Sequence, residues 1–123
     1  MEWYLLVLKK YAEFNGRARR KEYWMYALIN ILIIFVLEIA GFALIKNVTV
    51  VGYIFLALLG IYSLATLIPS LAVGIRRLHD TGKSGWWIFI SLIPFVGPII
   101  LLIFLVKDSD PGTNLYGPNP KLA

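Results

Sequence analysis

The chain has 123 residues, a formal net charge of +5, 59% hydrophobic residues and a mean hydropathy of +0.76. A soluble domain has roughly 45–50% apolar residues, so this composition excludes an ordinary soluble protein and indicates a membrane protein. The sequence has no cysteine, which excludes disulfides and thiolate metal sites, and its single histidine, His79, is too few for a zinc site. We therefore expect no metal and no cofactor. Because the basic residues adjoin hydrophobic segments, their expected partner is anionic lipid rather than nucleic acid.

The first predicted element covers residues 2–14, which are too few and too charged to cross a bilayer. On a helical projection, Glu2 and Lys9 share one face, and apolar or aromatic side chains cover much of the remaining circumference. We expect an amphipathic helix that lies in the membrane interface. It should end at Asn15 and Gly16, where glycine tolerates a left-handed cap.

Three long apolar segments follow, at residues 23–45, 50–75 and 86–106. A helix rises about 1.5 Å per residue and needs roughly 20 apolar residues to cross the ~30 Å hydrocarbon layer, so each segment is long enough. The sequence therefore predicts an all-α membrane protein with an interfacial helix and three transmembrane helices. The whole chain, 1–123, forms one membrane domain, and residues 107–123 form an irregular tail.

The third apolar segment is interrupted near its middle by Pro94, Gly97 and Pro98. Neighbouring helices can satisfy a kinked backbone inside the bilayer, so we favour a kinked spanning helix with Ser84 as its N-cap. The alternative is a re-entrant hairpin, which would return the tail to the side from which the segment entered.

Nine of the 12 lysines and arginines lie before the first predicted span or between the second and third. The other three are Lys46, Lys107 and Lys121. The positive-inside rule then places the N-terminus of a multi-pass protein in the cytoplasm. With three spans, the C-terminus is expected on the outside.

Three motifs stand before, between and after the spans. They read GRARRKEYW at 16–24, RRLHD at 76–80 followed by GKSGWW at 82–87, and GTNLYGPNP at 112–120. Together they resemble the small bacterial inner-membrane family typified by YhaH and YhaI, a domain of unknown function. The resemblance covers essentially the whole chain and implies a bacterial plasma-membrane location and a helical fold. Since that family has no established activity, the resemblance assigns no catalytic residue.

Enzymatic interpretations of the second motif are weak. The tripeptide GKS at 82–84 is not a phosphate-binding loop, because the glycine required five positions earlier is Arg77 and a membrane helix, not a strand, precedes it. His79, Asp80 and Ser84 are the residue types of a catalytic triad, but adjacent histidine and aspartate usually point apart. We expect no enzyme, and a membrane enzyme acting on lipid ranks third among the candidate functions.

The basic clusters favour binding. Arginine forks grip phosphate bidentately, so two arginine clusters on one membrane face can hold a phospholipid head group or a similar anion. The first candidate function is therefore a non-enzymatic module that binds anionic lipid or a membrane partner through a cytoplasmic arginine-rich face. The candidate ligand-binding residues are Arg17, Arg19, Arg20, Arg76, Arg77 and Lys83.

The structural alternative is that these arginines are neutralised within the protein. Glu22 is the expected counter-charge for Arg76 or Arg77, and Asp80 for an arginine of the turn at residues 16–20. Only arginines left over from such pairs can bind a ligand. Glu22, Asp80 and His79 are accordingly assigned structural or coupling roles.

Glu38 is the one acidic residue inside a predicted span, about 10 Å from its outer end, where a carboxylate is costly. We expect it to face the second span near Gly60, Tyr62 and Ser63, where small and hydroxyl residues ease its burial. In the packing interpretation it is protonated or hydrogen-bonded. The alternative function is an oligomeric transporter of a small solute or ion that uses Glu38, either as a homo-oligomer or with a membrane-protein partner.

Overall fold

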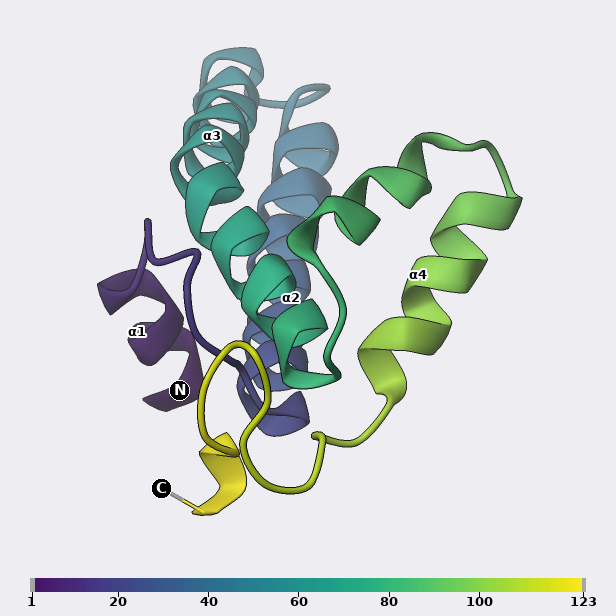
Figure 1. Cartoon of the computed structure of the whole chain (residues 1–123). Helices are drawn as coiled ribbons and strands as arrows, with labels where there is room; N and C mark the ends of the chain where they lie inside the picture. Colours follow the sequence, from purple (N-terminus) through teal and green to yellow (C-terminus); the bar gives the residue numbers. More distant parts are fainter. Residues whose placement is uncertain (1, 123) are drawn as a thin grey trace.

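The computed structural model of the chain describes residues 2–122, and these form helices joined by loops (Figure 1). The predicted all-α class is confirmed. In chain order the elements are α1 (Glu2–Lys9), α2 (Arg20–Leu44), α3 (Thr49–Asp80), the 3-10 helix η1 (Gly85–Leu92), α4 (Val96–Val106) and the short 3-10 helix η2 (Pro120–Leu122).

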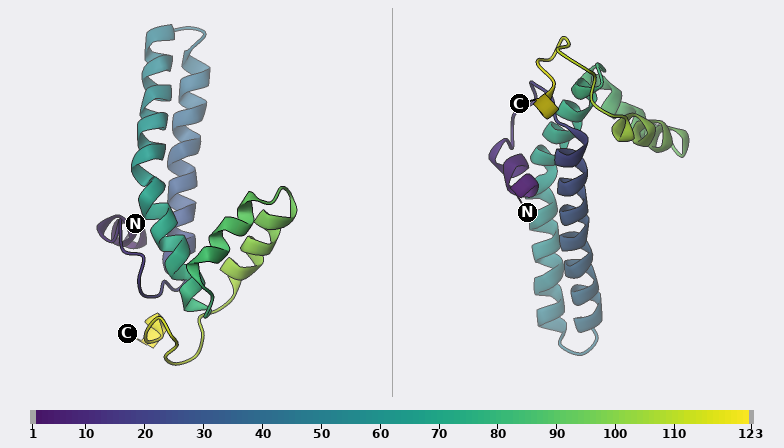
Figure 2. Two further views of the ribbon diagram at one scale, coloured as in Figure 1. Left: turned by 45° about the horizontal axis from the view of Figure 1, so that its top comes forward. Right: turned by 90° about the horizontal axis from the view of Figure 1, so that it is seen from below.

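The long helices α2 and α3 form an antiparallel pair, and both are long and apolar enough to cross a membrane (Figure 2). They cover the predicted spans 23–45 and 50–75. At about 1.5 Å per residue, the 32 residues of α3 extend roughly 48 Å, which exceeds the ~30 Å hydrocarbon layer. Its uncharged run stops at Ile75, because Arg76 and Arg77 follow. We therefore expect the last turn of α3 to lie beyond the hydrocarbon.

Two glycines allow the pair to pack closely at the end joined by the short α2–α3 connection. A Cβ on Gly41 would lie 2.6 Å from the Leu56 side chain, and one on Gly52 would lie 2.5 Å from Ile45 Cα. Closer to the termini, a hydrogen bond links the two helices: the Tyr62 hydroxyl donates to Asn30 Oδ1 at 2.7 Å. Small residues and cross-helix hydrogen bonds are the interactions that hold helices together in lipid.

The predicted third span, 86–106, is not one continuous helix. The segment forms a hairpin in which η1 leads away from α3 and α4 returns beside it (Figures 1 and 2). Pro94 has no N–H to donate, and Phe95 adopts a positive φ of 65°, which no continuous helix permits. With 11 residues, α4 rises only about 17 Å and is too short to span. The hairpin alternative describes the fold, and both termini lie at the same end of the α2–α3 pair (Figure 2).

Gly97 closes this hairpin, and Gly97→Ala is expected to open it. A Cβ at position 97 would lie 1.7 Å from the Ile90 carbonyl oxygen, a backbone atom that cannot move aside. We expect a destabilisation of roughly 1–3 kcal/mol, measured as a lower melting temperature in detergent. Gly60→Ala is the matched control, because no atom lies within 4 Å of a Cβ there. Equal melting temperatures for the two variants would contradict this account of the hairpin.

The first helix ends at Lys9, so the predicted range 2–14 was too long. Its amphipathic character holds, because Tyr4 and Val7 are buried in a cluster with Tyr26 and Val73. Tyr4 stacks on Tyr26 with ring centroids 5.5 Å apart and shares a 2.6 Å hydrogen bond with the Tyr62 hydroxyl. These contacts hold α1 against both long helices. An interfacial location for α1 stays a prediction.

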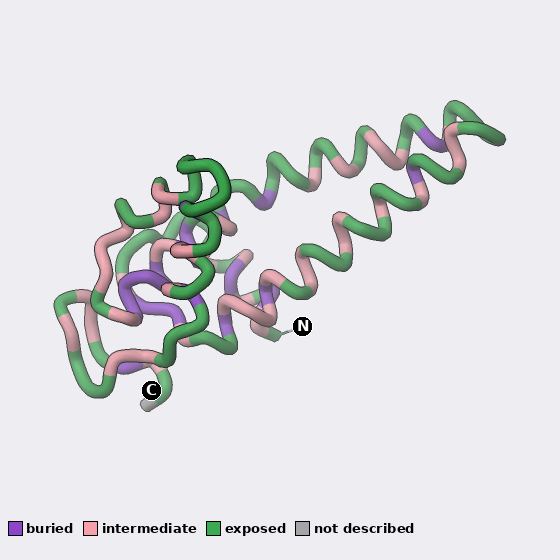
Figure 3. Tube along the Cα trace, turned by 90° about the vertical axis from the view of Figure 1, so that its right-hand side faces the viewer, coloured by how far each residue is buried: buried purple, intermediate pink, exposed green. Residues whose placement is uncertain are grey.

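Burial divides the molecule into two regions. Buried residues concentrate at the end of the α2–α3 pair that carries the termini, whereas the far part of both long helices is largely exposed (Figure 3). The exposed side chains there are large and apolar, among them Phe35, Val36 and Val50. That surface is suited to acyl chains, and the polar core lies at the other end of the protein.

Candidate functional site

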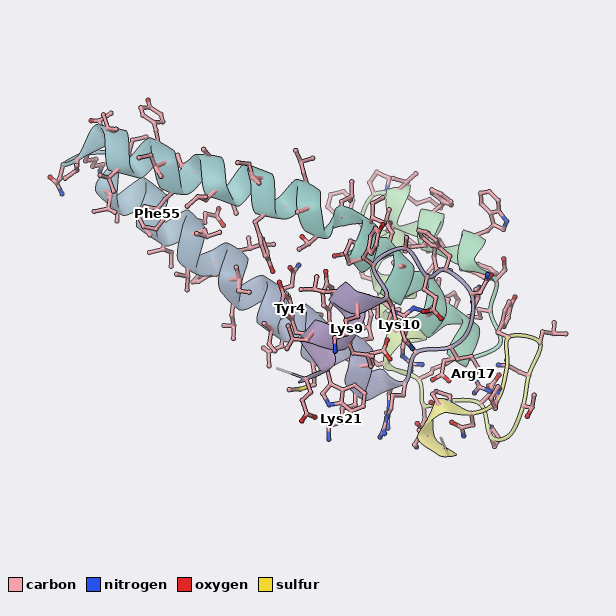
Figure 4. The ribbon with its side chains drawn as sticks, turned by 90° about the vertical axis from the view of Figure 1, so that its left-hand side faces the viewer. Tyr4, Lys9, Lys10, Arg17, Lys21 and Phe55 are labelled. Carbon is pink, nitrogen blue, oxygen red and sulfur yellow. The ribbon has the colours of Figure 1, made fainter. Side chains whose placement is uncertain are left out.

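Arg17 is the centre of a buried polar cluster that joins the three sequence motifs. Its Nε donates to Asp80 Oδ1 at 2.9 Å, and Nη2 donates to the Asp80 carbonyl at 3.1 Å. The same guanidinium donates to the carbonyls of Asp110 at 2.8 Å, Gly112 at 2.8 Å and Gly117 at 3.0 Å. One side chain thus holds the C-terminal loop against the end of α3, and Figure 4 shows Arg17 beside that loop.

Asp80 lies between two arginines and is completely buried. Its Oδ2 accepts a 2.7 Å hydrogen bond from Arg77 Nη1 and another from the Ser109 hydroxyl. Arg77 also donates from Nε to the Leu105 carbonyl at 3.2 Å, which ties the end of α4 to α3. The predicted pairing of Asp80 with an arginine of the 16–20 turn is confirmed, and that arginine is Arg17.

Arg76 forms the second buried ion pair, with Glu22 at the start of α2. The Nη1···Oε2 distance is 2.5 Å, and Arg76 Nε donates to the Glu13 carbonyl at 3.0 Å. The predicted assignment of Glu22 to Arg76 or Arg77 is therefore confirmed for Arg76. Both charges are buried, so the pair fixes the N-terminal loop and α2 to α3.

These contacts separate the predicted ligand-binding arginines into two groups. Arg17, Arg76 and Arg77 are at most 8% exposed and donate to protein acceptors, so their role in this structure is to hold segments together. Arg19 and Arg20 remain at the surface. Arg19 lies over the Trp3 ring, 5.5 Å from its centroid.

Lys83 lies beside Lys107 and does not join Arg19 and Arg20. Its ammonium group stands over the Phe104 ring of α4, 4.7 Å from the centroid. Partial burial lowers the pKa of Lys83, and the neighbouring charge of Lys107 lowers it further. Lys83 thus contributes to packing of the hairpin rather than to the group around Arg20.

The exposed basic residues line a small cavity of about 170 Å³, which we call the basic pocket. Its lining residues are Arg19, Arg20, Lys21, Asp108 and Lys121. Asp108 pairs with Lys121 at 3.0 Å and with Arg20 at 3.7 Å. These neighbours hold the pKa of Asp108 below its usual value, with the Lys121 hydrogen bond the largest cause, so Asp108 stays ionised at neutral pH. Four cations against one carboxylate leave the pocket with a charge of about +3.

An apolar groove adjoins the basic pocket. It has a volume of about 500 Å³ and is lined by Arg20, Lys21, Trp24, Met25 and Val106. Arg20 and Lys21 line both spaces. Two bonds hold α4 against α2 here, from Trp24 Nε1 to the Leu105 carbonyl at 3.0 Å and from Arg20 to the Val106 carbonyl at 3.2 Å. A charged site beside an apolar one suits an amphiphilic anion.

Sequence reasoning missed the part of this site that comes from α4 and the tail. A span at 86–106 places Val106, Asp108 and Lys121 at the outer side of the membrane, away from Arg20 and Lys21. The one available signal was the Pro94–Pro98 interruption, which also predicted the hairpin alternative.

Glu38 does not occupy its predicted position. The side chain is exposed on the outside of the helix pair, and it has no hydrogen bond among the described residues 2–122. The residues expected beside Glu38 do not contact it. The Tyr62 hydroxyl donates to Asn30, and no atom occupies the space beside Gly60. The α2 face that meets α3 carries Asn30, and Glu38 lies about 80° around the helix from it. The predicted packing of Glu38 against Gly60, Tyr62 and Ser63 is wrong.

Two long apolar helices, a folded-back helical hairpin and a buried arginine–carboxylate core define a small helical membrane protein. The chain belongs to the family described as "Protein of unknown function (DUF805)", whose model matches residues 11–118. It is 44% identical over 126 residues to the inner membrane protein YhaH of Escherichia coli K12, covering 99% of this chain and 98% of that protein. It is 45% identical over 121 residues to the inner membrane protein YhaI of the same strain, covering 98% of this chain and 97% of that protein.

No solved structure matches the chain. The family resemblance and the bacterial inner-membrane location expected from the motifs are confirmed by these relatives.

Proposed function

We propose that the protein is a non-enzymatic module that binds anionic phospholipid of the inner membrane. The head-group phosphate occupies the basic pocket, and an acyl chain lies in the apolar groove. The observation that carries this proposal is that Arg20 and Lys21 line both spaces, so one molecule with an anionic head and an apolar chain can fill them together. The sequence placed Arg17, Arg76 and Arg77 in the ligand site. In this proposal they do not contact the ligand, and their internal ion pairs hold together the segments that form the site.

The start of α2 adds to the attraction for an anion. The first turn of a helix has amide N–H groups without intrahelical partners and a positive end of the helix dipole. Arg19, the N-cap of α2, makes no side-chain capping hydrogen bond. A phosphate group at this position would meet the cationic side chains and these amides together.

The distribution of basic residues supports a location of this site on the cytoplasmic side of the membrane. With the hairpin folded back, Lys107 and Lys121 join the group at the end that carries the termini, which leaves only Lys46 of 12 at the opposite end. By the positive-inside rule, that end faces the cytoplasm, whose leaflet carries anionic lipid. Both termini are then cytoplasmic.

Replacement of Arg20 and Lys21 by glutamine is expected to weaken retention of phosphatidylglycerol by about 30-fold. Each basic residue near an anionic head group contributes about 1 kcal/mol, so loss of two costs about 2 kcal/mol. Native mass spectrometry of the detergent-solubilised protein would compare phosphatidylglycerol with phosphatidylcholine. The proposal requires a specific loss for phosphatidylglycerol.

Lys46→Gln is the matched control, because it removes a positive charge at the other end of the molecule. It should leave retention of phosphatidylglycerol unchanged. If the Arg20 and Lys21 replacements retain phosphatidylglycerol as well as the wild type does, the proposed function is excluded.

A further inference from the structure

A second cavity lies between the N-terminal loop, the end of α3, η1 and the C-terminal tail. It has a volume of about 430 Å³, and none of its lining residues lines the basic pocket or the apolar groove. The lining residues that matter here are Phe14, His79, Ser84, Trp86, Phe89 and Tyr116. No lysine, arginine, aspartate or glutamate is among the residues that line this cavity in the described chain. Its wall is therefore aromatic and apolar, with His79 as the titratable side chain of interest.

The His79 ring is held in one orientation. Its Nδ1 lies 3.0 Å from the Gly16 carbonyl oxygen, and because a carbonyl only accepts, Nδ1 carries the hydrogen. On one side the ring stacks on Tyr116, with centroids 3.8 Å apart and planes within 1° of parallel. With 8% of its surface exposed, His79 has little freedom to turn.

The other ring nitrogen, Nε2, is left as a hydrogen-bond acceptor beside Gly85, which lines the same cavity. It has no hydrogen-bond partner among residues 2–122. Gly85 keeps the approach open, since a Cβ at that position would lie 3.6 Å from Nε2. Burial lowers the pKa of His79, and the Gly16 hydrogen bond opposes this only in part, so the ring is neutral at pH 7. A neutral imidazole with hydrogen on Nδ1 accepts at Nε2.

Ser84 supplies the complementary group. Its Oγ accepts a 3.3 Å hydrogen bond from the Trp86 backbone N–H, so Ser84 is an N-cap as predicted, but of η1 and not of a spanning helix. In the part of the chain that the structure describes, its own O–H has no acceptor and is available to donate. Both residues line the cavity, so a ligand hydroxyl there has an acceptor in His79 Nε2 and a donor in the Ser84 hydroxyl. A carboxylate or phosphate would find no counter-charge among the lining residues. An ether has no hydrogen to donate to His79 Nε2.

We propose that this cavity is a binding site for an uncharged lipid alcohol, whose hydroxyl donates to His79 Nε2. The apolar chain of the ligand lies against Trp86 and Phe89, which line the cavity and are 78% and 55% exposed on the hairpin. This site is separate from the one for anionic phospholipid and does not depend on it.

The single histidine makes the test direct. Protein labelled with ¹⁵N at His79 would be placed in phosphatidylcholine nanodiscs and titrated with 1-dodecanol or with its methyl ether. The alcohol is expected to give a saturable shift of the Nε2 resonance towards that of a hydrogen-bonded acceptor, with Nδ1 still protonated. The ether, which has the same chain and no donor, should leave the Nε2 resonance in place. Equal responses to the two compounds, or no response to either, would overturn the proposal.

A second measurement isolates the hydrogen bond. His79→Phe keeps a ring to stack on Tyr116 but has no hydrogen-bond acceptor. The probe is 1-dodecanol with a terminal bromine, which quenches tryptophan fluorescence when it binds. Its affinity for the variant should be roughly five- to tenfold lower than for the wild type, the effect of one hydrogen bond. Affinity for the brominated methyl ether should be the same in both proteins. Unchanged affinity of the variant for the alcohol would overturn the proposal, and the labelled wild-type experiment decides the case if the variant does not fold.

Discussion

Arg17→Lys is expected to detach the C-terminal loop and to lower the stability of the whole protein. The guanidinium makes five hydrogen bonds to Asp80, Asp110, Gly112 and Gly117, whereas a lysine ammonium has three donors and no fork. Loss of at least two bonds from a charged donor, at about 1.5–3 kcal/mol each, predicts a destabilisation of at least about 3 kcal/mol. Thermal unfolding in detergent measures the loss, and faster tryptic cleavage at Lys107 reports release of the loop.

Arg20→Lys is the control for this substitution. It makes the same chemical change at a side chain that is 50% exposed, where Arg20 pairs with Asp108 at 3.7 Å and donates one exposed hydrogen bond to the Val106 carbonyl. Exposed pairs contribute about 0–1 kcal/mol, so its melting temperature and cleavage rate should stay close to those of the wild type. Similar behaviour of the two variants would show that the Arg17 contacts do not hold the loop.

Reporter fusions at the two termini are expected to give the same result. The hairpin of η1 and α4 turns the chain back, so only α2 and α3 are long enough to span, and two spans bring both ends to one face. The charge distribution predicts that this face is cytoplasmic. A cytoplasm-active reporter should therefore work at residue 2 and after residue 122, an all-or-none difference from a three-span protein.

A reporter inserted after Asn47, in the connection between α2 and α3, provides the internal control. It should report the periplasmic side while both terminal fusions report the cytoplasm. A C-terminal fusion that agrees with the Asn47 fusion would mean that the segment 86–106 spans after all.

The elements that the sequence could predict are those governed by local chemistry. Uncharged runs marked the two long helices, and Ser84 was recognisable as an N-cap from its place before an apolar run. The ion pairs of Arg76 with Glu22 and of Arg17 with Asp80 followed from one idea, that two antiparallel spans bring their charged ends together. Because a buried carboxylate at that end has few cations within reach, its partner could be predicted from the sequence.

The features that escaped prediction depend on backbone angles and on contacts between distant segments. Hydropathy does not distinguish a kinked span from a hairpin, and the choice rests on the positive φ of Phe95 and on the contact of Gly97 with Ile90. The basic pocket escaped because Lys121 joins it from the other end of the chain. Glu38 was misplaced because the face of α2 that meets α3 carries Tyr26, Asn30 and Gly41, and the exposed carboxylate lies on another face.

The bonds from Arg17 to the C-terminal loop also fix the order of events during synthesis. Arg17 and Gly117 are 100 positions apart, so at about 5–20 residues per second the arginine is made roughly 5–20 s before its last acceptor exists. During that interval the helix pair can enter the membrane while the polar groups at the end that carries the termini are still hydrated. Closure of the loop is then the final step of maturation, and a nascent chain that stops short of Gly117 leaves an incomplete, protease-sensitive end.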